Sequence, residues 1–395
     1  MKSILQTTYF RLCTVTVFAD VMEKSLFQRF FAYMRIDKTD EASKRKAYAN
    51  FVKEIYEGSG VLTTLVEKLV SEDENVYVKN VAAKQPINDF IVQAAETELK
   101  TFSVFAALSP DDFALDMGVD KDTLPQFSSF NKDMGGVYEE RLRNIGKYGY
   151  GIFSAYGMFR LSDDREIEPI VSADKTEMSH FIGYEEERAQ VVANTQAFIE
   201  GRPAANVLLC GDAGAGKSST VKAVANAFFK EGVRLIELRK DQLRYLPYVM
   251  GKVSGNPLKF IIFIDDLAFN KSDDNFSMLK AALEGSASAK ADNAVIYATS
   301  NRRHIIKESF GDREGDDVHR NDTLQESLSL SERFGLVVLF SKPNKALYLE
   351  IVRQLAKRYH IEMDVKQLEI KAEAFALKKG NRSARCAEQF VESLL

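Results

Sequence analysis

The spacing of apolar residues divides the chain into parts with different expected structures. Over residues 1 to about 160, apolar side chains recur every three or four positions, as in Phe27, Phe30 and Phe31, and this spacing predicts helices. From about residue 174, short apolar runs alternate with helical stretches, a pattern typical of a parallel sheet whose strands are joined by helices. We expect strands at residues 206–210, 234–238, 260–264, 294–299 and 336–340. After Pro343 the spacing is helical again as far as Leu395.

This pattern predicts three domains. Residues 1–172 form a mainly helical domain, in which we find no motif that carries chemistry, so we expect an accessory or partner-binding role. A short strand at 166–171 leads from it into a linker. Residues 173–342 form an α/β core, and residues 343–395, too short for a second sheet, form a small helical lid.

Composition narrows the class of protein without naming a function. The chain has 395 residues, 45% hydrophobic and 28% charged, as in ordinary soluble proteins with two or three domains. The net charge of −4 does not indicate nucleic-acid binding by bulk charge, although a local basic patch stays open. Cys13, Cys210 and Cys386 have no paired spacing, which predicts buried thiols in a reducing compartment. Because no run of 18 apolar residues or signal peptide is evident, we expect a cytoplasmic protein without a membrane span.

The strongest motif is the sequence GDAGAGKS at residues 211–218. It matches the phosphate-binding loop (P-loop) pattern and stands between an expected strand and an expected helix, the context that the motif requires. The backbone N–H groups of such a loop surround phosphate oxygens, Lys217 reaches the β- and γ-phosphates, and the Ser218 hydroxyl ligates Mg²⁺. We therefore expect a nucleoside triphosphate here. The expected phosphate-binding residues are Gly211, Asp212, Ala213, Gly214, Ala215, Gly216, Lys217, Ser218 and Ser219.

Two carboxylates follow the apolar run at 260–264, about 40 residues after the P-loop. Ligands of open α/β sheets bind at the carboxyl ends of the strands. We expect Asp265 to hold Mg²⁺ and Asp266 to polarise the attacking water, where many hydrolases have the longer glutamate. A solvent-facing acidic strand end is the alternative, which the P-loop makes the weaker one.

Asn301 follows the next apolar run, 294–299. A neighbouring strand would bring its amide beside the γ-phosphate, where it can orient water. Arg302, Arg303 and His304 come directly after it and could contact phosphate or a partner, but surface ion pairs explain them equally well.

Three arginines are candidates for contact with the γ-phosphate. Arg333 ends a helix just before the last expected strand, a position from which it would insert into the site of a neighbouring subunit. The alternative for Arg333 is a favourable interaction with the helix dipole. Arg385 lies at the start of the final helix, with Ser383 as the expected cap, and we expect it to sense γ-phosphate in its own subunit. Arg382 is the alternate for that role.

Taken together and in this order, the motifs resemble those of AAA+ ATPases. The Phe181-Ile182-Gly183 segment resembles the family's entry motif, which lines the adenine pocket, so Ile182 and Gly183 are expected there. The Asp265-Asp266-Leu267 ending is similar to the branch of replication initiators and helicase loaders. The whole set resembles more closely an uncharacterised bacterial AAA+ family known as a domain of unknown function. The stretches that carry this resemblance are IGYEEERAQVVANTQAF, NVLLCGDAGAGKSSTVKA, IDDLAF, YATSNRRH, LSLSERFGL and GNRSAR, between residues 174 and 395.

The resemblance implies a five-stranded parallel sheet with the order 5-1-4-3-2, a helical lid, and ATP and Mg²⁺ as ligands. It also implies a homo-oligomeric ring or partial ring, a hexamer being one form, with ATP sites between subunits. The aromatic-hydrophobic-glycine pore loop of the threading subfamilies is missing from residues 239–251, where helix packing explains Tyr245, Tyr248 and Met250 at least as well. We expect an exposed loop at the hydrophilic residues 311–322.

Three functions agree with these motifs. The first is a Mg-ATP hydrolase that remodels or loads an unidentified macromolecular client. The second is an ATP-gated assembly switch with little turnover, which the aspartate at position 266 favours. The third is a loader of nucleic acid, which rests on the initiator-like motif and on Arg302 and Arg303. The sequence does not distinguish the clients.

Overall fold

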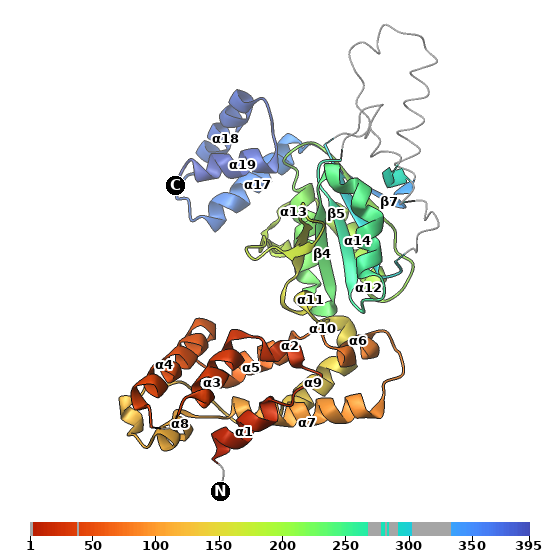
Figure 1. Ribbon diagram of the computed structural model, residues 1–395. Coiled ribbons are helices and arrows are strands. Elements are labelled where there is room, and N and C mark those ends of the chain that lie inside the picture. Colours follow the sequence, from red (N-terminus) through yellow and green to blue (C-terminus); the bar gives the residue numbers. More distant parts are fainter. Residues whose placement is uncertain (1–2, 38, 268–277, 281–282, 284–290, 302–332) are drawn as a thin grey trace. The chain divides into compact units, whose positions relative to one another are not determined.

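The computed structural model describes residues 3–37, 39–267, 278–280, 283, 291–301 and 333–395. The chain divides into two compact units, Met1–Ala155 and Tyr156–Leu395 (Figure 1). The sequence analysis set the domain boundary at residue 172. The division of the structure lies earlier in the chain, because residues 158–169 form strands that pair with the sheet of the second unit.

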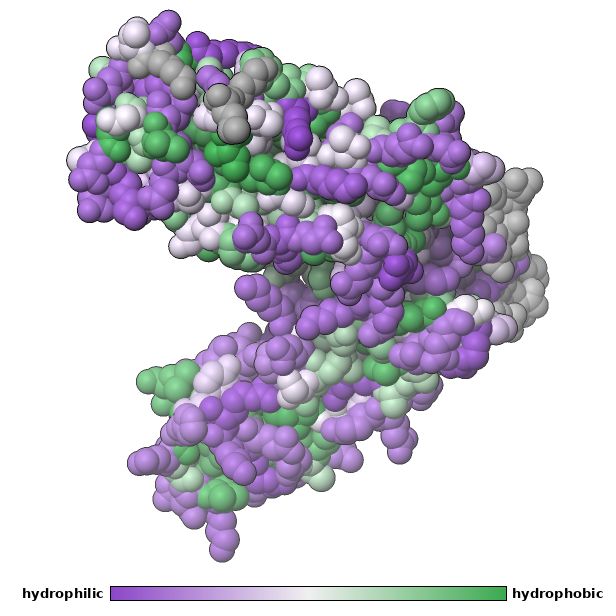
Figure 2. Space-filling view, turned by 90° about the horizontal axis from the view of Figure 1, so that it is seen from below, coloured by the Kyte–Doolittle hydropathy of each residue, from purple (hydrophilic) through white to green (hydrophobic). Residues whose placement is uncertain are grey.

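The first unit is helical, as the spacing of its apolar residues predicts. A cluster of aromatic side chains forms its centre, with Phe27 stacked on Phe105 at 4.8 Å between ring centroids. Large apolar side chains also remain exposed, among them Phe10, Phe90 and Leu115. The face of the molecule seen in Figure 2 shows apolar areas interspersed with hydrophilic ones. The elements are α1 Ile4–Leu12, α2 Ala19–Met22, α3 Ser25–Arg35, α4 Glu41–Gly58, α5 Leu62–Ser71, α6 Val76–Ala82, α7 Asp89–Ala106, α8 Pro110–Met117, the 3₁₀ turn η1 Lys121–Thr123, α9 Met134–Arg143, α10 Ile145–Tyr148 and α11 Ile152–Ala155.

A mostly parallel sheet organises the second unit. Within the described residues it has seven strands in the order β2-β1-β4-β5-β6-β3-β7, and only β1 and β2 pair in antiparallel fashion. The prediction of an α/β fold with a parallel sheet is confirmed, whereas the prediction of five strands is wrong. The strands are β1 Met158–Leu161, β2 Ile167–Pro169, β3 Val207–Gly211, β4 Val233–Leu238, β5 Lys259–Ile264, β6 Ala294–Ser300 and β7 Leu336–Phe340.

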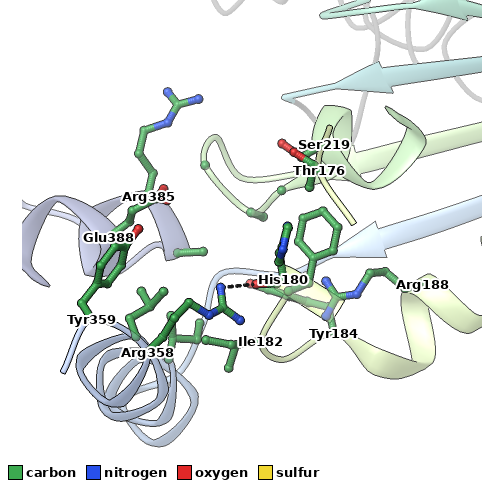
Figure 3. A pocket seen from close by; sticks show the side chains of 17 residues that line it. Thr176, His180, Ile182, Tyr184, Arg188, Ser219, Arg358, Tyr359, Arg385 and Glu388 are labelled. Carbon is green, nitrogen blue, oxygen red and sulfur yellow. Dashed lines mark hydrogen bonds between the residues drawn. The ribbon is translucent and has the colours of Figure 1, made fainter. Parts of the chain in front are cut away.

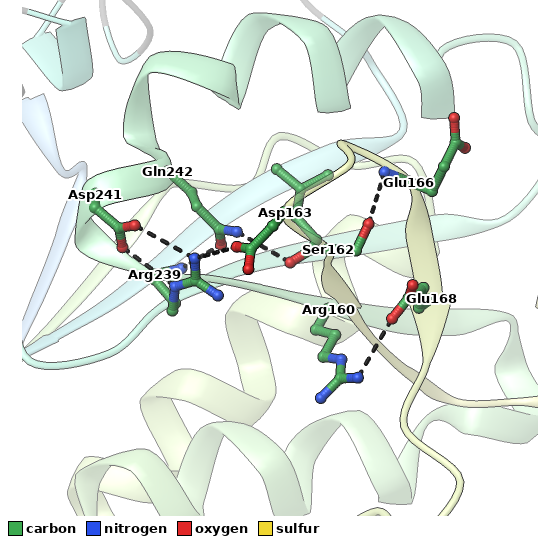
Figure 4. Close-up of polar contacts among 9 residues, drawn as sticks. Arg160, Ser162, Asp163, Glu166, Glu168, Arg239, Asp241 and Gln242 are labelled. Atoms are coloured by element: carbon green, nitrogen blue, oxygen red, sulfur yellow. Dashed lines mark hydrogen bonds and ion pairs between the residues drawn. The ribbon is translucent and has the colours of Figure 1, made fainter.

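The two additional strands cover the edge of β4, which would otherwise present unpaired N–H and C=O groups. Polar contacts hold this hairpin in place (Figure 4). Arg160 and Glu168 form an ion pair across its two strands, at 3.3 Å. Gln242, which follows β4, donates to the backbone oxygen of Leu161 at 3.0 Å. The hairpin therefore belongs to the sheet and not to the helical unit.

Helices of the second unit lie beside the sheet and in the lid. Each of the five residues of β3 is buried, which explains its unbroken apolar run. The lid helices α17, α18 and α19 share a small apolar core of their own. None of the helices in the part of the chain that the structure describes combines the length and the apolar character needed to cross a bilayer. The remaining elements are η2 Met178–His180, α12 Glu185–Ile199, α13 Lys217–Ala227, η3 Phe229–Glu231, η4 Lys240–Tyr245, α14 Leu246–Val253, α17 Lys345–Arg358, α18 Val365–Lys379 and α19 Ala384–Glu392.

Cysteine burial agrees with the sequence analysis in part. Cys210 and Cys386 are buried free thiols, but Cys13 is exposed, so the prediction that it is buried is wrong. It directly follows the last residue of α1, where the helix ends at the surface.

Candidate nucleotide-binding site

The pairing of the strands places the candidate residues together, at the carboxyl-terminal ends of the strands. Cys210 of β3 pairs with Ser300 of β6, and Ile264 of β5 pairs with Ala298 of β6. The three strands therefore end side by side, although their sequences are far apart. The residues that follow them are the P-loop, the two aspartates and Asn301.

The P-loop connects β3 to α13 through glycines with positive φ. These angles are 137° at Gly211, 81° at Gly214 and 84° at Gly216, which caps α13. Side chains disfavour such conformations, so these positions require glycine. Because loop N–H groups and a helix N-terminus both favour anions, the loop is suited to phosphate.

Gly211 also lies against β7, and a first testable prediction follows from this contact. A Cβ atom added to Gly211 would lie 2.0 Å from the backbone oxygen of Phe340. We expect Gly211→Ala to lower the free energy of unfolding by at least about 1–3 kcal/mol, the typical cost of local backbone strain, with the clash in addition. Chemical denaturation measures the loss. Gly255→Ala is the control, since Gly255 has positive φ but open space around it, and an equal loss in both variants would contradict the role of the contact.

Lys217 is the centre of the polar contacts at these strand ends. Its side chain is buried, with the residue 5% exposed. Its ammonium group donates to the backbone oxygens of Gly211 at 2.9 Å and Asp212 at 2.8 Å, and to Asn301 Oδ1 at 3.0 Å. Burial lowers the pKa of Lys217, while nearby carboxylates, chiefly that of Asp212, act in the opposite direction. The lysine thus connects the P-loop to the end of β6.

Asp265 accepts hydrogen bonds from two hydroxyl groups. Ser218 Oγ donates at 2.6 Å, and Thr299 Oγ1 donates to the same carboxylate oxygen. Thr299 Oγ1 in turn accepts from the backbone N–H of Asp266 at 2.9 Å. These contacts fix the carboxylate beside the first turn of α13.

A hydroxyl and a carboxylate oxygen at hydrogen-bond distance form a donor set that fits Mg²⁺, which binds few protein groups and keeps water and phosphate as further ligands. The described residues contain no group of three or more His, Cys, Asp or Glu side chains that could enclose a metal by themselves. Ser218 and Asp265 would therefore hold Mg²⁺ together with the phosphates, and the ion would neutralise phosphate charge.

Asp266 and Asn301 form the outer part of this arrangement. Asp266 has φ of 52°, an uncommon value for a residue other than glycine. Its carboxylate accepts from Asn301 Nδ2 at 2.8 Å. Since Asn301 also accepts from Lys217, a continuous chain of hydrogen bonds runs from Lys217 through Asn301 to Asp266. Such a chain can position the carboxylate and amide that a hydrolytic water requires.

A pocket of about 490 Å³ lies between the P-loop, the start of α12 and the lid (Figure 3). Ile182 lines this pocket, whereas Gly183 lies beside it, where an added Cβ atom would be 2.6 Å from Leu347 of the lid. Apolar side chains from both the entry segment and the lid contribute to the walls. The lining residues include Phe181, Ile182, Gly214, Ala215, Gly216, Ser219, Ile351, Leu355, Tyr359 and Arg385.

Arg382 and Arg385 have different surroundings. Arg382 forms two hydrogen bonds with the carboxylate of Glu373 in α18, at 3.0 and 2.8 Å. Arg385 lines the pocket, and its backbone N–H donates to the oxygen of Gly214 at 3.3 Å. Arg385 is therefore the one that the fold brings to the P-loop, while Arg382 connects the loop before α19 to α18.

Arg333 lies at the opposite end of the sheet from the P-loop. Leu336, three residues later, pairs with Val207 at the start of β3, and Phe340 pairs with Gly211 at its end. Four residues of strand separate these two levels by about 13 Å. Arg333 thus does not join the site of its own chain. Arg302, Arg303 and His304, and the expected loop at 311–322, lie outside the described residues.

A family model described as "Protein of unknown function (DUF815)" matches residues 154–395, more than half of the chain. The chain belongs to the DUF815 family. The resemblance to a family known as a domain of unknown function, stated from the sequence motifs, is thereby confirmed. The sequence of this DUF815 member matches no curated protein.

Among solved structures, this DUF815 member is similar to three of the RuvB Holliday junction branch migration motor of Thermotoga maritima, two of them variants. The identity is 14%, and the alignments cover 55% of this chain and 71% of RuvB. The TM-scores are 0.34, 0.34 and 0.33, too low for any inference about activity.

Sequence reasoning missed three residues of the site in this DUF815 member. Thr299 ends an expected strand, and its polar side chain at the edge of an apolar run was a usable signal. Arg188 lines the pocket from α12. Arg358 of α17 donates to the backbone oxygens of His180 at 3.0 Å and Ser179 at 3.4 Å, which connects the lid to the entry segment. No local pattern distinguishes these two arginines from other helical arginines.

Proposed function

We propose that this DUF815 member is a Mg²⁺-dependent AAA+ ATPase that couples ATP binding and hydrolysis to the remodelling or loading of a macromolecular client. The observation that carries the proposal is the hydrogen-bond chain from Lys217 through Asn301 to Asp266. It unites groups that follow three different strands, β3, β6 and β5, at the glycine loop. A phosphate loop by itself supports binding, whereas a carboxylate and an amide beside it support hydrolysis.

Each residue has a distinct role in this proposal. Lys217 binds the β- and γ-phosphates, and Ser218 and Asp265 hold Mg²⁺. Asp266 polarises the attacking water and Asn301 orients it. The five strands expected from the sequence lie in the order β7-β3-β6-β5-β4, which corresponds to the order 5-1-4-3-2 of AAA+ proteins and supports the assignment to that class.

The proposed active form is a homo-oligomer, a ring or partial ring. The support is the distance along β7 between Arg333 and the P-loop of the same chain. In a head-to-tail assembly the same arginine reaches the site of the next subunit, where it stabilises the charge of the transition state.

The two lid arginines give a paired prediction. We expect Arg385→Ala to reduce turnover at saturating ATP by about 10- to 100-fold, the effect of losing a hydrogen bond from a charged group. Arg382→Ala should leave turnover within about threefold of wild type, because Arg382 pairs with Glu373 inside the lid, and should instead lower the melting temperature. Steady-state hydrolysis and thermal melts measure the two effects. The opposite pattern would assign the sensing role to Arg382.

Turnover measured against protein concentration tests the proposed function. A hydrolase with sites between subunits shows appreciable activity per chain that rises steeply as the chain assembles. An ATP-gated assembly switch, the second candidate, shows ATP-dependent assembly with little turnover. The aspartate at position 266, shorter than the glutamate of many hydrolases, favours the switch. Absence of both ATP binding and hydrolysis would contradict both functions.

The nucleic-acid loader is tested in the same assay. Its basic residues, Arg302 and Arg303, lie outside the described residues, so its support is the sequence alone. Stimulation of turnover by DNA or RNA, with a strong dependence on salt, would identify nucleic acid as the client. If neither DNA nor RNA changes turnover, a protein is the client that this proposal retains.

A further inference from the structure

Arg188 of α12 is a buried cation in the wall of the pocket. The residue is 6% exposed, and its guanidinium carbon lies 4.8 Å from the centroid of the Phe181 ring (Figure 3). In the part of the chain that the structure describes, its guanidinium forms no hydrogen bond and no ion pair. Burial lowers the pKa of Arg188, and the carboxylates of Glu185 and Glu187 oppose this shift only in part. Arg188 thus carries its positive charge in a buried environment that disfavours charged groups.

Arg358 and His180, which line the same pocket, already have partners. Arg358 donates to two backbone oxygens, and His180 Nδ1 accepts from the backbone N–H of Glu177 at 3.2 Å. A buried charge without an acceptor destabilises a fold, and removing such a charge is often stabilising. Structural need therefore does not explain Arg188. Because a guanidinium has donors and no acceptor, a ligand that completes its hydrogen bonds must present acceptor atoms.

The position of Arg188 along the pocket indicates which part of a nucleotide it meets. The phosphates belong to the P-loop, at Gly211 to Ser218. The Phe181 ring packs against this loop, 3.7 Å from where a Cβ atom of Gly216 would be. Ile182, Ile351 and Leu355 give the pocket that Arg188 lines apolar walls, suited to a flat base.

We propose that Arg188 is a specificity-determining residue that donates hydrogen bonds to ring-nitrogen acceptors on the edge of the purine base of the bound nucleotide. The guanidinium lies over the Phe181 ring, and this cation–π contact helps to hold it in place. The inference rests on the proposed function, which places a nucleoside triphosphate in this pocket. It adds a base-reading polar side chain to a site whose other assigned polar side chains contact phosphate, metal or water.

Binding of ATP and of inorganic tripolyphosphate to Arg188→Met tests the proposal. Tripolyphosphate occupies the P-loop but has no base. We expect the variant to bind Mg-ATP about 10- to 100-fold more weakly, the effect of losing a hydrogen bond from a charged group, and to bind tripolyphosphate like wild type. The nucleotide-free variant should melt at or above the wild-type temperature, because a buried unpaired charge is gone.

The control is Arg202→Met, which removes an exposed arginine paired with Glu200 outside the pocket. It should leave the affinities for both ligands unchanged. Equal loss of ATP and tripolyphosphate affinity in Arg188→Met, or a lower melting temperature of its nucleotide-free form, would assign Arg188 a structural role and overturn the proposal.

A second measurement uses the wild-type chain and does not depend on how a variant folds. The ATP analogues that lack one ring nitrogen each, at position 1, 3 or 7 of the purine, are compared with ATP. We expect wild type to lose about 10- to 100-fold in affinity for at least one analogue, and Arg188→Met to bind that analogue and ATP alike. Wild-type binding of all three analogues as tightly as ATP would overturn the proposal while leaving the ATPase intact. If wild type binds neither ATP nor tripolyphosphate, the proposed function itself fails.

Discussion

Replacing Lys217 with alanine is expected to weaken ATP binding by about 2–5 kcal/mol, roughly 30-fold to several-thousand-fold, and to abolish turnover. Lys217 is buried and donates three hydrogen bonds, to the P-loop and to Asn301. A triphosphate would replace some of these acceptors with charged oxygens, and charge-assisted hydrogen bonds are the stronger kind. Alanine leaves the phosphate charge without its cation. Titration calorimetry with ATP and tripolyphosphate measures the loss, which should be similar for the two ligands.

Lys222→Ala is the matched control for Lys217→Ala. Lys222 lies on the same helix, α13, but pairs with Glu237 of β4 at 3.5 Å. We expect this variant to bind ATP like wild type. Circular dichroism establishes that both variants fold. A Lys217→Ala chain that is folded and binds ATP with wild-type affinity would contradict the nucleotide site at the P-loop.

The sheet could be predicted where its strands are fully buried. The runs at 206–210 and 260–264 correspond to β3, Val207–Gly211, and β5, Lys259–Ile264. Parallel strands covered on both faces require apolar side chains at successive positions, so a local reading of the sequence finds them. Helix starts could also be predicted from a few neighbouring residues. Ser383 accepts from the N–H of Cys386 at 3.1 Å, as expected for a capping residue.

Strand β1 could not be predicted, because nothing local distinguishes it. Its residues continue a series of aromatic side chains, Phe153, Tyr156 and Phe159, that is equally compatible with a helix. The strand forms because Phe159 pairs with Ile236 of β4, far along the chain. Pairing between distant segments depends on the whole fold, whereas helical spacing depends on a few neighbours.

For the candidate site, the sequence indicates which residues carry chemistry, but not how they contact one another. The residues of the P-loop could be expected to lie together, since they are consecutive in the sequence. The contact of Thr299 with both Asp265 and Asp266 requires β5 and β6 to be adjacent, which the motifs alone do not specify. Arg382 and Arg385 were both candidates because both stand near one helix start. Their difference depends on Glu373, which lies on another helix.

Replacing Arg333 with alanine is expected to lower turnover by about 10³- to 10⁵-fold while ATP affinity stays near the wild-type value. Lys217 and the rest of the P-loop remain intact in this variant, so the ground state keeps its contacts. What is lost is the stabilisation of transition-state charge by a neighbouring subunit. Binding and single-turnover hydrolysis are measured at concentrations where the chain assembles. Arg202→Ala, which removes an exposed arginine paired with Glu200, is the control and should hydrolyse ATP normally.

Mixing two inactive variants tests whether Arg333 acts between subunits. An Arg333→Ala chain keeps an intact P-loop, and a Lys217→Ala chain keeps an intact Arg333. In a mixed oligomer some interfaces combine the P-loop of the first with the arginine of the second, so activity should reappear on mixing and rise with the extent of co-assembly. An arginine that acted within its own chain would give no recovery, because neither variant has both groups. Co-assembly without recovered hydrolysis, or wild-type turnover in Arg333→Ala alone, would contradict a site shared between subunits.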